Sequence, residues 1–120
     1  MKVICKVWLD NNGKVFGEGP YLLLKKVQKS HSLHQAANEM GMSYSKAWRL
    51  IRTIEQRLGF LLLERRTGGR SGGGSEVTPE GKKLMKNYEK FQKDIKEAIE
   101  KIYQKHFCSN ESILSLQKRK

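Results

Sequence analysis

Residues 32–59 decide the fold and read SLHQAANEMGMSYSKAWRLIRTIEQRLG. Ser32, with Gln35 three positions later, forms a capping box in which the serine hydroxyl accepts from the Gln35 amide. The pattern predicts a short helix ending at Gly41, because a left-handed C-terminal position costs glycine little. Ser43 then caps a second helix over residues 44–58. Two helices joined by a short turn containing glycine are typical of a helix-turn-helix unit.

Apolar residues follow helical spacing through both of these helices. The expected buried positions are Leu33, Ala36, Ala37 and Met40 in the first helix, and Ala47, Trp48, Ile51, Ile54 and Leu58 in the second. Beyond Gly59, residues 60–65 predict a strand, residues 67–75 a glycine-rich loop, and residues 76–77 the returning strand. Thr78-Pro79 is an N-cap followed by a first-position proline, which predicts a last helix over residues 78–106.

The residues before the helix-turn-helix predict a hairpin and one more helix. Residues 2–16 are rich in β-branched and aromatic residues and contain the tight-turn pair Asn12-Gly13. Pro20 is expected to begin a helix that ends near Lys29. Leu22, Leu23, Leu24 and Val27 are expected to face the core. The whole pattern predicts a mainly α fold with small β-hairpins, a winged helix-turn-helix with a long C-terminal helix.

The chain is strongly basic. It has 120 residues, 24 Lys and Arg against 12 Asp and Glu, and a formal net charge of +12. This balance suits a polyanionic partner, either nucleic acid or an anionic membrane. Residues 43–75 hold seven basic and two acidic residues. No run approaches the roughly 18 apolar residues of a membrane span, and the start lacks the apolar core of a signal peptide, so we expect a cytoplasmic protein with no membrane partner.

The polar face of helix 44–58 and the glycine-rich loop carry residues suited to DNA. Arg49 is the strongest candidate base reader, because its planar fork can donate two hydrogen bonds to guanine. Tyr44 is expected either to contact DNA or to pack under the wing, and Arg57 to contact the DNA backbone or nothing. The loop arginines are expected over phosphates or in the minor groove. The predicted DNA-binding residues are Ser43, Tyr44, Ser45, Lys46, Arg49, Arg52, Arg65, Arg66, Thr67 and Arg70.

Other readings of these residues are weaker. A strand and a capped helix flank the loop closely, which argues against a flexible linker. No Gly-Lys-Ser or Gly-Lys-Thr follows it, which argues against a nucleotide site. His31 and His34 straddle a capping serine without a third ligand, so we expect surface or capping roles and no metal. Cys5 and Cys108 are expected to be reduced thiols. The acids lie beside lysines, so we expect no catalytic group, no enzyme activity and no cofactor.

The last helix carries a second pattern. Leu84, Tyr88, Phe91, Ile95, Ala98 and Ile102 recur at spacings of 4, 3, 4, 3 and 4, a heptad seam suited to helix pairing. Leu84 and Tyr88 are expected inside their own domain, and the later positions against a second subunit in a homodimer. The predicted dimerisation residues are Phe91, Ile95, Ala98, Ile99 and Ile102. We expect residues 1–106 to form one DNA-binding domain that includes this helix, and residues 107–120 a basic, flexible tail.

Several blocks of the chain resemble the DNA-binding domain of molybdate-responsive regulators of the ModE type, which is itself similar to that of LysR-type regulators. The blocks are FGEG at 16–19, SLHQAA at 32–37, GMSYSKAW at 41–48, RRTGG at 65–69 and GGG at 72–74. The resemblance implies a homodimer whose recognition helices and wings hold a palindromic operator. It also implies a separate oxyanion-binding module, but only 14 residues follow His106. We therefore expect no molybdate-binding module in this chain.

Three functions remain open at this point. The leading hypothesis is a dimeric, sequence-specific transcription regulator that binds duplex DNA through residues 32–81. A second is an adaptor whose heptad seam binds a partner protein, with little contact to DNA. A third is a nonspecific chromosome-associated protein, whose affinity would depend steeply on salt and not on sequence.

Overall fold

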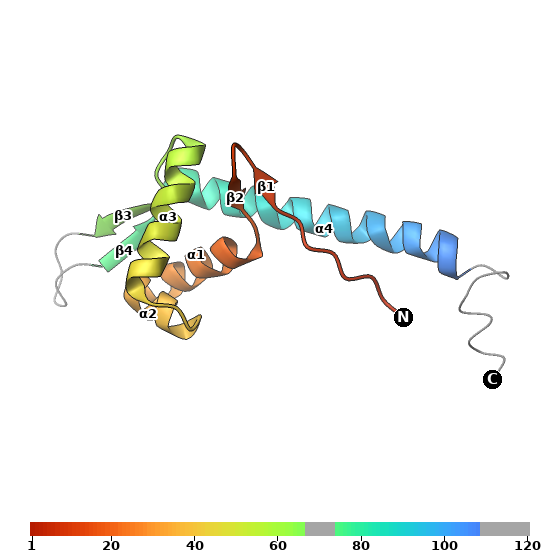
Figure 1. The fold of residues 1–120 in the computed structure, drawn as a ribbon, viewed down its shortest axis with the longest axis horizontal. Coiled ribbons are helices and arrows are strands. Elements are labelled where there is room, and N and C mark those ends of the chain that lie inside the picture. Colours follow the sequence, from red (N-terminus) through yellow and green to blue (C-terminus); the bar gives the residue numbers. More distant parts are fainter. Residues whose placement is uncertain (67–73, 109–120) are drawn as a thin grey trace. The chain divides into compact units, whose positions relative to one another are not determined.

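The computed structural model describes residues 1–66 and 74–108 (Figure 1). Its elements are β1 (Leu9–Asp10), β2 (Lys14–Phe16), α1 (Glu18–Ser30), α2 (Leu33–Glu39), α3 (Tyr44–Leu58), β3 (Leu63–Arg66), β4 (Gly74–Val77) and α4 (Pro79–Phe107). They divide into one unit of residues 6–86 and another formed by residues 1–5 with residues from 87 onward. The mainly helical composition, the two antiparallel hairpins and the element order confirm the predicted winged helix-turn-helix.

The N-terminal hairpin is much shorter than predicted. β1 and β2 pair antiparallel around a turn in which Asn12 has φ 58° and Gly13 has φ 128°. The Gly13 amide donates to Asp10 Oδ1 at 3.1 Å. Residues 1–8 form no strand, and all of them except Val7 are exposed. A strand with no buried face gains too little to hold its pairing, so the β-branched and aromatic residues there do not extend the hairpin.

Helix α1 begins earlier than predicted and exposes one residue that was expected in the core. Gly17 is its N-cap, and Pro20 is the third helical residue, still within the turn whose amides have no helical partner. The buried residues of α1 are Pro20, Leu23, Leu24 and Val27. Leu22 is 38% exposed. The expectation that Leu22 faces the core was wrong. The buried stripe follows spacings of three and four from Pro20, through Leu23, Leu24 and Val27, and Leu22 lies beside it.

The helix-turn-helix follows the prediction closely. Ser32 Oγ accepts from the Gln35 amide at 3.0 Å, and Ser43 Oγ accepts from the Lys46 amide at 3.1 Å. Helix α2 ends at Glu39 with Met40 as its C-cap, and Gly41 follows with φ 70°. In α3 the residues Ala47, Ile51 and Ile54 are buried as expected, whereas Trp48 and Leu58 are half-buried. The two helices therefore rest on a shared apolar core in residues 6–86.

In the wing, β3 begins later than predicted and β4 begins earlier, at Gly74 and not at residue 76, and the loop before β3 is tied to the start of α4. Strand β3 begins at Leu63, not at residue 60, and pairs in register with β4. Leu61 is 51% exposed and its carbonyl accepts from Thr78 Oγ1 at 2.6 Å. The same hydroxyl accepts from the Gly81 amide at 2.9 Å, which makes Thr78 the predicted N-cap of α4. The hydroxyl therefore holds the loop before β3 against the first turn of α4.

Some predictions concern residues that the structure does not describe. Thr67 and Arg70 lie in the loop between β3 and β4, outside the described residues. Of the tail predicted for residues 107–120, only Phe107, which ends α4, and Cys108 are described. Within the described residues, none of the helices is both long and apolar enough to traverse a lipid bilayer.

Candidate nucleic-acid interface

Helix α3 presents an exposed polar face. Ser43, Tyr44, Ser45, Lys46 and Arg49 are all exposed at its start and along its first two turns. Ser45 and Arg49 are four residues apart and therefore share one side of the helix. Within the described residues, neither of these two side chains makes a hydrogen bond or ion pair. The predicted base reader Arg49 is thus positioned on a rigid helix with its five donors available.

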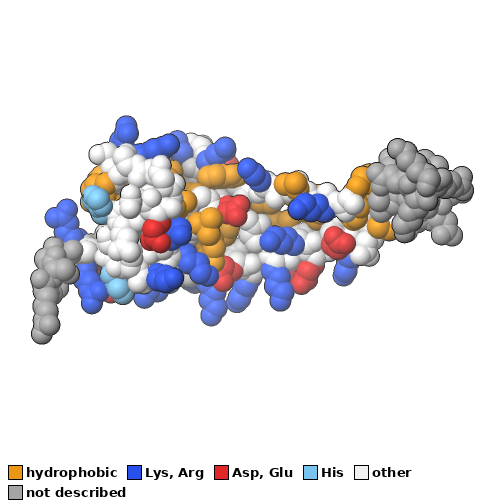
Figure 2. Space-filling view, turned by 90° about the horizontal axis from the view of Figure 1, so that it is seen from below, with side chains coloured by type: hydrophobic (Ala, Val, Ile, Leu, Met, Phe, Trp, Pro, Cys, Tyr) orange, Lys and Arg blue, Asp and Glu red, His pale blue; other side chains and the backbone are white. Residues whose placement is uncertain are grey.

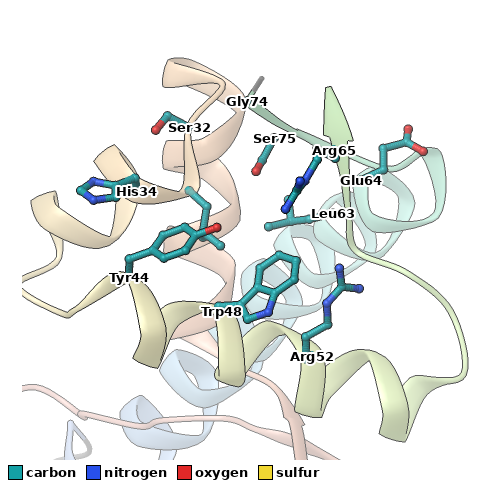
Figure 3. A pocket seen from close by; sticks show the side chains of 11 residues that line it. Ser32, His34, Tyr44, Trp48, Arg52, Leu63, Glu64, Arg65, Gly74 and Ser75 are labelled. Carbon is teal, nitrogen blue, oxygen red and sulfur yellow. The ribbon is translucent and has the colours of Figure 1, made fainter. Parts of the chain in front are cut away.

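On another side of α3, aromatic side chains stack on one another. The Tyr44 ring lies 5.4 Å from the ring of His34 and 6.4 Å from that of Trp48, at interplanar angles of 26° and 16°. The Arg52 guanidinium lies 4.1 Å from the Trp48 centroid. Because Tyr44, Trp48 and Arg52 are four residues apart, they form one column along α3. This column faces the wing, as Figure 3 shows.

Arg52 also forms an ion pair with a buried carboxylate, which was not predicted from the sequence. Its Nη1 lies 2.7 Å from Glu55 Oε1, and its side chain is 41% exposed. Glu55 is 5% exposed, and its Oε2 accepts from the amides of Leu62 at 2.7 Å and Leu63 at 3.1 Å. The carboxylate thus links α3 to the start of β3. A signal was available, because Glu55 lies four residues after Ile51, on the apolar stripe.

The other wing strand is anchored at the corner between α1 and α2. The Ser75 amide donates to the His31 carbonyl at 2.9 Å. His31 is the C-cap of α1 with φ 58°, in agreement with the capping role expected for it. A Cβ atom added at Gly74 would collide with the His31 carbonyl oxygen. Gly74 is therefore required for the close approach of β4 to this corner.

Arg57 has a contact that was not expected. Its Nη1 donates to the Lys14 carbonyl at 2.8 Å, and its own carbonyl accepts from Asn11 Nδ2 at 2.9 Å. A Cβ at Gly13 would lie 2.5 Å from Arg57 Cζ. Arg57 therefore joins the end of α3 to the N-terminal hairpin, so the alternative that it contacts nothing was wrong, and its contact with the DNA backbone stays a prediction.

A cleft of about 530 Å³ lies between α3, the start of α2 and the wing (Figure 3). Its lining includes the column Tyr44, Trp48 and Arg52 on one side and Leu63, Arg65 and Ser75 on the other. Of the predicted site residues, the structure brings Tyr44, Arg52 and Arg65 to this cleft, whereas it places Ser45 and Arg49 on the neighbouring face of α3. The face drawn in Figure 2 carries more Lys and Arg side chains than acidic ones.

The helix-turn-helix, the wing and the exposed polar face of α3 together define the winged helix-turn-helix class, a class typical of DNA-binding domains. Residues 21–82 match the family described as bacterial regulatory helix-turn-helix protein, lysR family. The match covers more than half of the chain, and the chain belongs to this family.

Three relatives confirm the resemblance to ModE-type regulators in the N-terminal region. The DNA-binding transcriptional dual regulator ModE of Escherichia coli (strain K12) is 40% identical over 67 residues, 56% of this chain and 26% of the relative. The transcriptional regulator ModE of Haemophilus influenzae is 32% identical over 91 residues, 76% of this chain and 33% of the relative. The molybdenum-pterin-binding protein MopB of Rhodobacter capsulatus is 33% identical over 82 residues, 68% of this chain and 30% of the relative.

The chain thus spans between 26% and 33% of the length of these relatives. Among solved structures, Vibrio fischeri DarR in complex with DNA superposes with a TM-score of 0.51 and 24% identity, covering 72% of this chain and 28% of that one. This likeness supports the fold.

Proposed function

We propose that this chain is a sequence-specific DNA-binding transcription regulator and not an enzyme. The observation that carries the proposal is the exposed face of α3, where Ser45 and Arg49 have no intramolecular partner within the described residues. Unpartnered donors on a capped helix next to a wing are suited to the floor of the major groove. The names of the ModE relatives as transcriptional regulators support the same reading.

In the proposed complex, α3 enters the major groove and the wing follows the backbone or the minor groove. Arg49 reads bases with Ser45 and Lys46 beside it, while Ser43 at the start of the helix binds a phosphate. Thr67 and Arg70 are assigned to the wing contact from sequence alone. We also place the protein in the cytoplasm, where its DNA would lie.

The active form is proposed to be a homodimer paired through α4. Phe91 is 41% exposed, Ile102 is 58% exposed, and Ala98 is also exposed. Ile95 and Ile99 are half-buried. These apolar side chains recur at heptad spacing on a helix of 29 residues, a pattern suited to pairing with a second α4. Residues 1–106 are proposed to act as one DNA-binding domain that contains this helix.

Selection of bound fragments from the host genome tests the function directly. We expect enrichment of a palindromic site whose half-sites lie about 34 Å apart, one turn of duplex. A scrambled duplex of equal length and composition is the control. Enrichment of no motif, with affinity that falls steeply with salt, would favour a chromosome-associated protein instead. Capture of a stable partner protein without duplex binding at physiological salt would favour an adaptor.

A further inference from the structure

The two adjacent arginines of β3 face opposite sides of the wing. Side chains alternate along a strand, so Arg65 shares a face with Leu63, and Arg66 shares the other face with Glu64. The register sets Arg65 opposite Ser75 and Leu63 opposite Val77, and both Leu63 and Val77 are buried. Arg65 and Ser75 therefore continue the inner face of the wing. Arg65 lines the cleft beside α3, whereas Arg66 does not.

Three donors converge in this cleft. In Figure 3 the Tyr44 hydroxyl, the Ser75 hydroxyl and the Arg65 guanidinium point into the same space. The Ser75 backbone is fixed by its hydrogen bond to His31 at 2.9 Å. The Tyr44 ring is held in the stack with Trp48 at 6.4 Å. The donors therefore come from two walls, each of which is anchored independently.

The charges of the cleft leave one positive group available. The Arg52 charge is paired with Glu55 at 2.7 Å. Arg65 makes no ion pair within the described residues, and Figure 3 shows the Glu64 carboxylate directed away from the cleft centre. One guanidinium with two hydroxyl groups matches an anion that carries one charge and several acceptor oxygens. Arginine suits phosphate in particular, because its fork donates two parallel hydrogen bonds.

The remaining lining is mixed, with apolar side chains beside those of Ser32, His34 and Glu64. Leu33 and Leu63 are buried and Trp48 is half-buried, and these three side chains form the apolar part of the cleft. The cleft, at about 530 Å³, is larger than a phosphate group alone requires. A sugar attached to the phosphate would cover this apolar part, so the combination fits a nucleotide backbone unit better than a free anion.

We propose that the cleft binds one phosphodiester, with its deoxyribose, of a DNA strand that passes between α3 and the wing. Arg65, Ser75 and Tyr44 hold the phosphate oxygens, and Arg66 takes no part. The proposal rests on the proposed function, since it names the partner group of one part of that interface. It also assigns Tyr44 to a phosphate contact.

Single methylphosphonate substitutions along the selected duplex test the proposal, because each removes one backbone charge. For the wild-type chain we expect a loss of affinity of about 10-fold at one phosphate in each half-site. The R65A variant should lose a similar factor on the unmodified duplex and be insensitive to the modification at that phosphate. The R66A variant, with the same charge change on the next residue, should keep the sensitivity. Y44F and S75A should reduce it partially.

Equal responses of R65A and R66A at every phosphate would overturn the proposal. Titration of the free wild-type chain with inorganic phosphate at constant ionic strength tests whether the cleft binds a free phosphate ion and not a DNA phosphodiester. Saturable shifts of the Ser75 amide signal, without any sensitivity to methylphosphonate, would assign the cleft to a free anion and overturn the proposal. The proposed function fails by a different result, namely that the wild-type chain prefers no sequence. The contrast between R65A and R66A can still be measured in that case, because it needs only a duplex that binds.

Discussion

The carboxylate of Glu55 accepts a hydrogen bond from the Leu62 backbone amide at 2.7 Å, and this contact joins α3 to the residue that precedes β3 of the wing. A second hydrogen bond, from the Leu63 amide at 3.1 Å, reaches the same carboxylate oxygen, Oε2. The two amides at the start of β3 therefore share one acceptor. Arg52 neutralises the other oxygen at 2.7 Å. The spacing between α3 and the wing is thus set by one buried side chain, and a DNA strand would have to fit that spacing.

Replacement of Glu55 should therefore destabilise the fold and loosen the wing. Glu55→Ala leaves two amides and the Arg52 guanidinium without their acceptor, and we expect a loss of about 3 kcal/mol in the free energy of unfolding. Glu55→Gln keeps an acceptor oxygen and should lose less. Urea denaturation measures both variants. Glu64→Ala is the control, since this exposed acid faces Glu76 across the strands and its removal should change stability by less than about 0.5 kcal/mol.

Gly74→Ala tests the anchor between β4 and the α1–α2 corner. The added Cβ would collide with the His31 carbonyl oxygen, so β4 must shift and the Ser75–His31 hydrogen bond must lengthen. We expect a stability loss of about 2 kcal/mol and weaker duplex binding. Gly19→Ala is the matched control, because nothing lies within 4 Å of its Cβ and alanine favours the helix. Equal melting temperatures for the two variants would contradict the role of Gly74.

Local chemistry explains what the sequence predicts well. Ser32, Ser43 and Thr78 cap their helices through a hydroxyl and an amide three residues later, so each helix start is encoded within four residues. The apolar spacing of α3 likewise needs no knowledge of the rest of the chain. The winged helix-turn-helix order and the exposed candidates Ser45 and Arg49 follow from these two patterns alone.

The parts that were missed depend on contacts between distant residues. Glu55 is buried where its carboxylate accepts from the amides of residues 62 and 63, and this contact depends on how the loop after α3 returns. Arg57 binds Lys14, 43 residues away along the chain. The assignment of Arg65 to the cleft and of Arg66 to the outer face depends on the register between β3 and β4. A change of one residue in this register would exchange the faces of the two side chains.

Arg49→Ala should relax preference at one base step of the selected site. Losing a bidentate contact to guanine removes about 1–3 kcal/mol of discrimination at that position while leaving other positions unchanged. Arg70→Ala, in the glycine-rich loop, should instead weaken binding to every sequence and reduce the salt slope by about one. Competition binding with single-base variants of the site checks both outcomes. A uniform loss for Arg49→Ala would show that this side chain binds a phosphate and not a base.

Phe91→Glu should separate the proposed dimer. A carboxylate in an apolar helix seam loses hydration without a partner, so the paired state becomes unfavourable while the exposed position tolerates the change in the monomer. We expect sedimentation at the monomer mass and a loss of operator affinity of at least about 100-fold, because each half-site is then bound alone. Gln104→Glu introduces the same charge on the opposite side of α4 and should leave the dimer intact. If Phe91→Glu still sediments as a dimer, α4 pairs through another face or the subunits associate elsewhere.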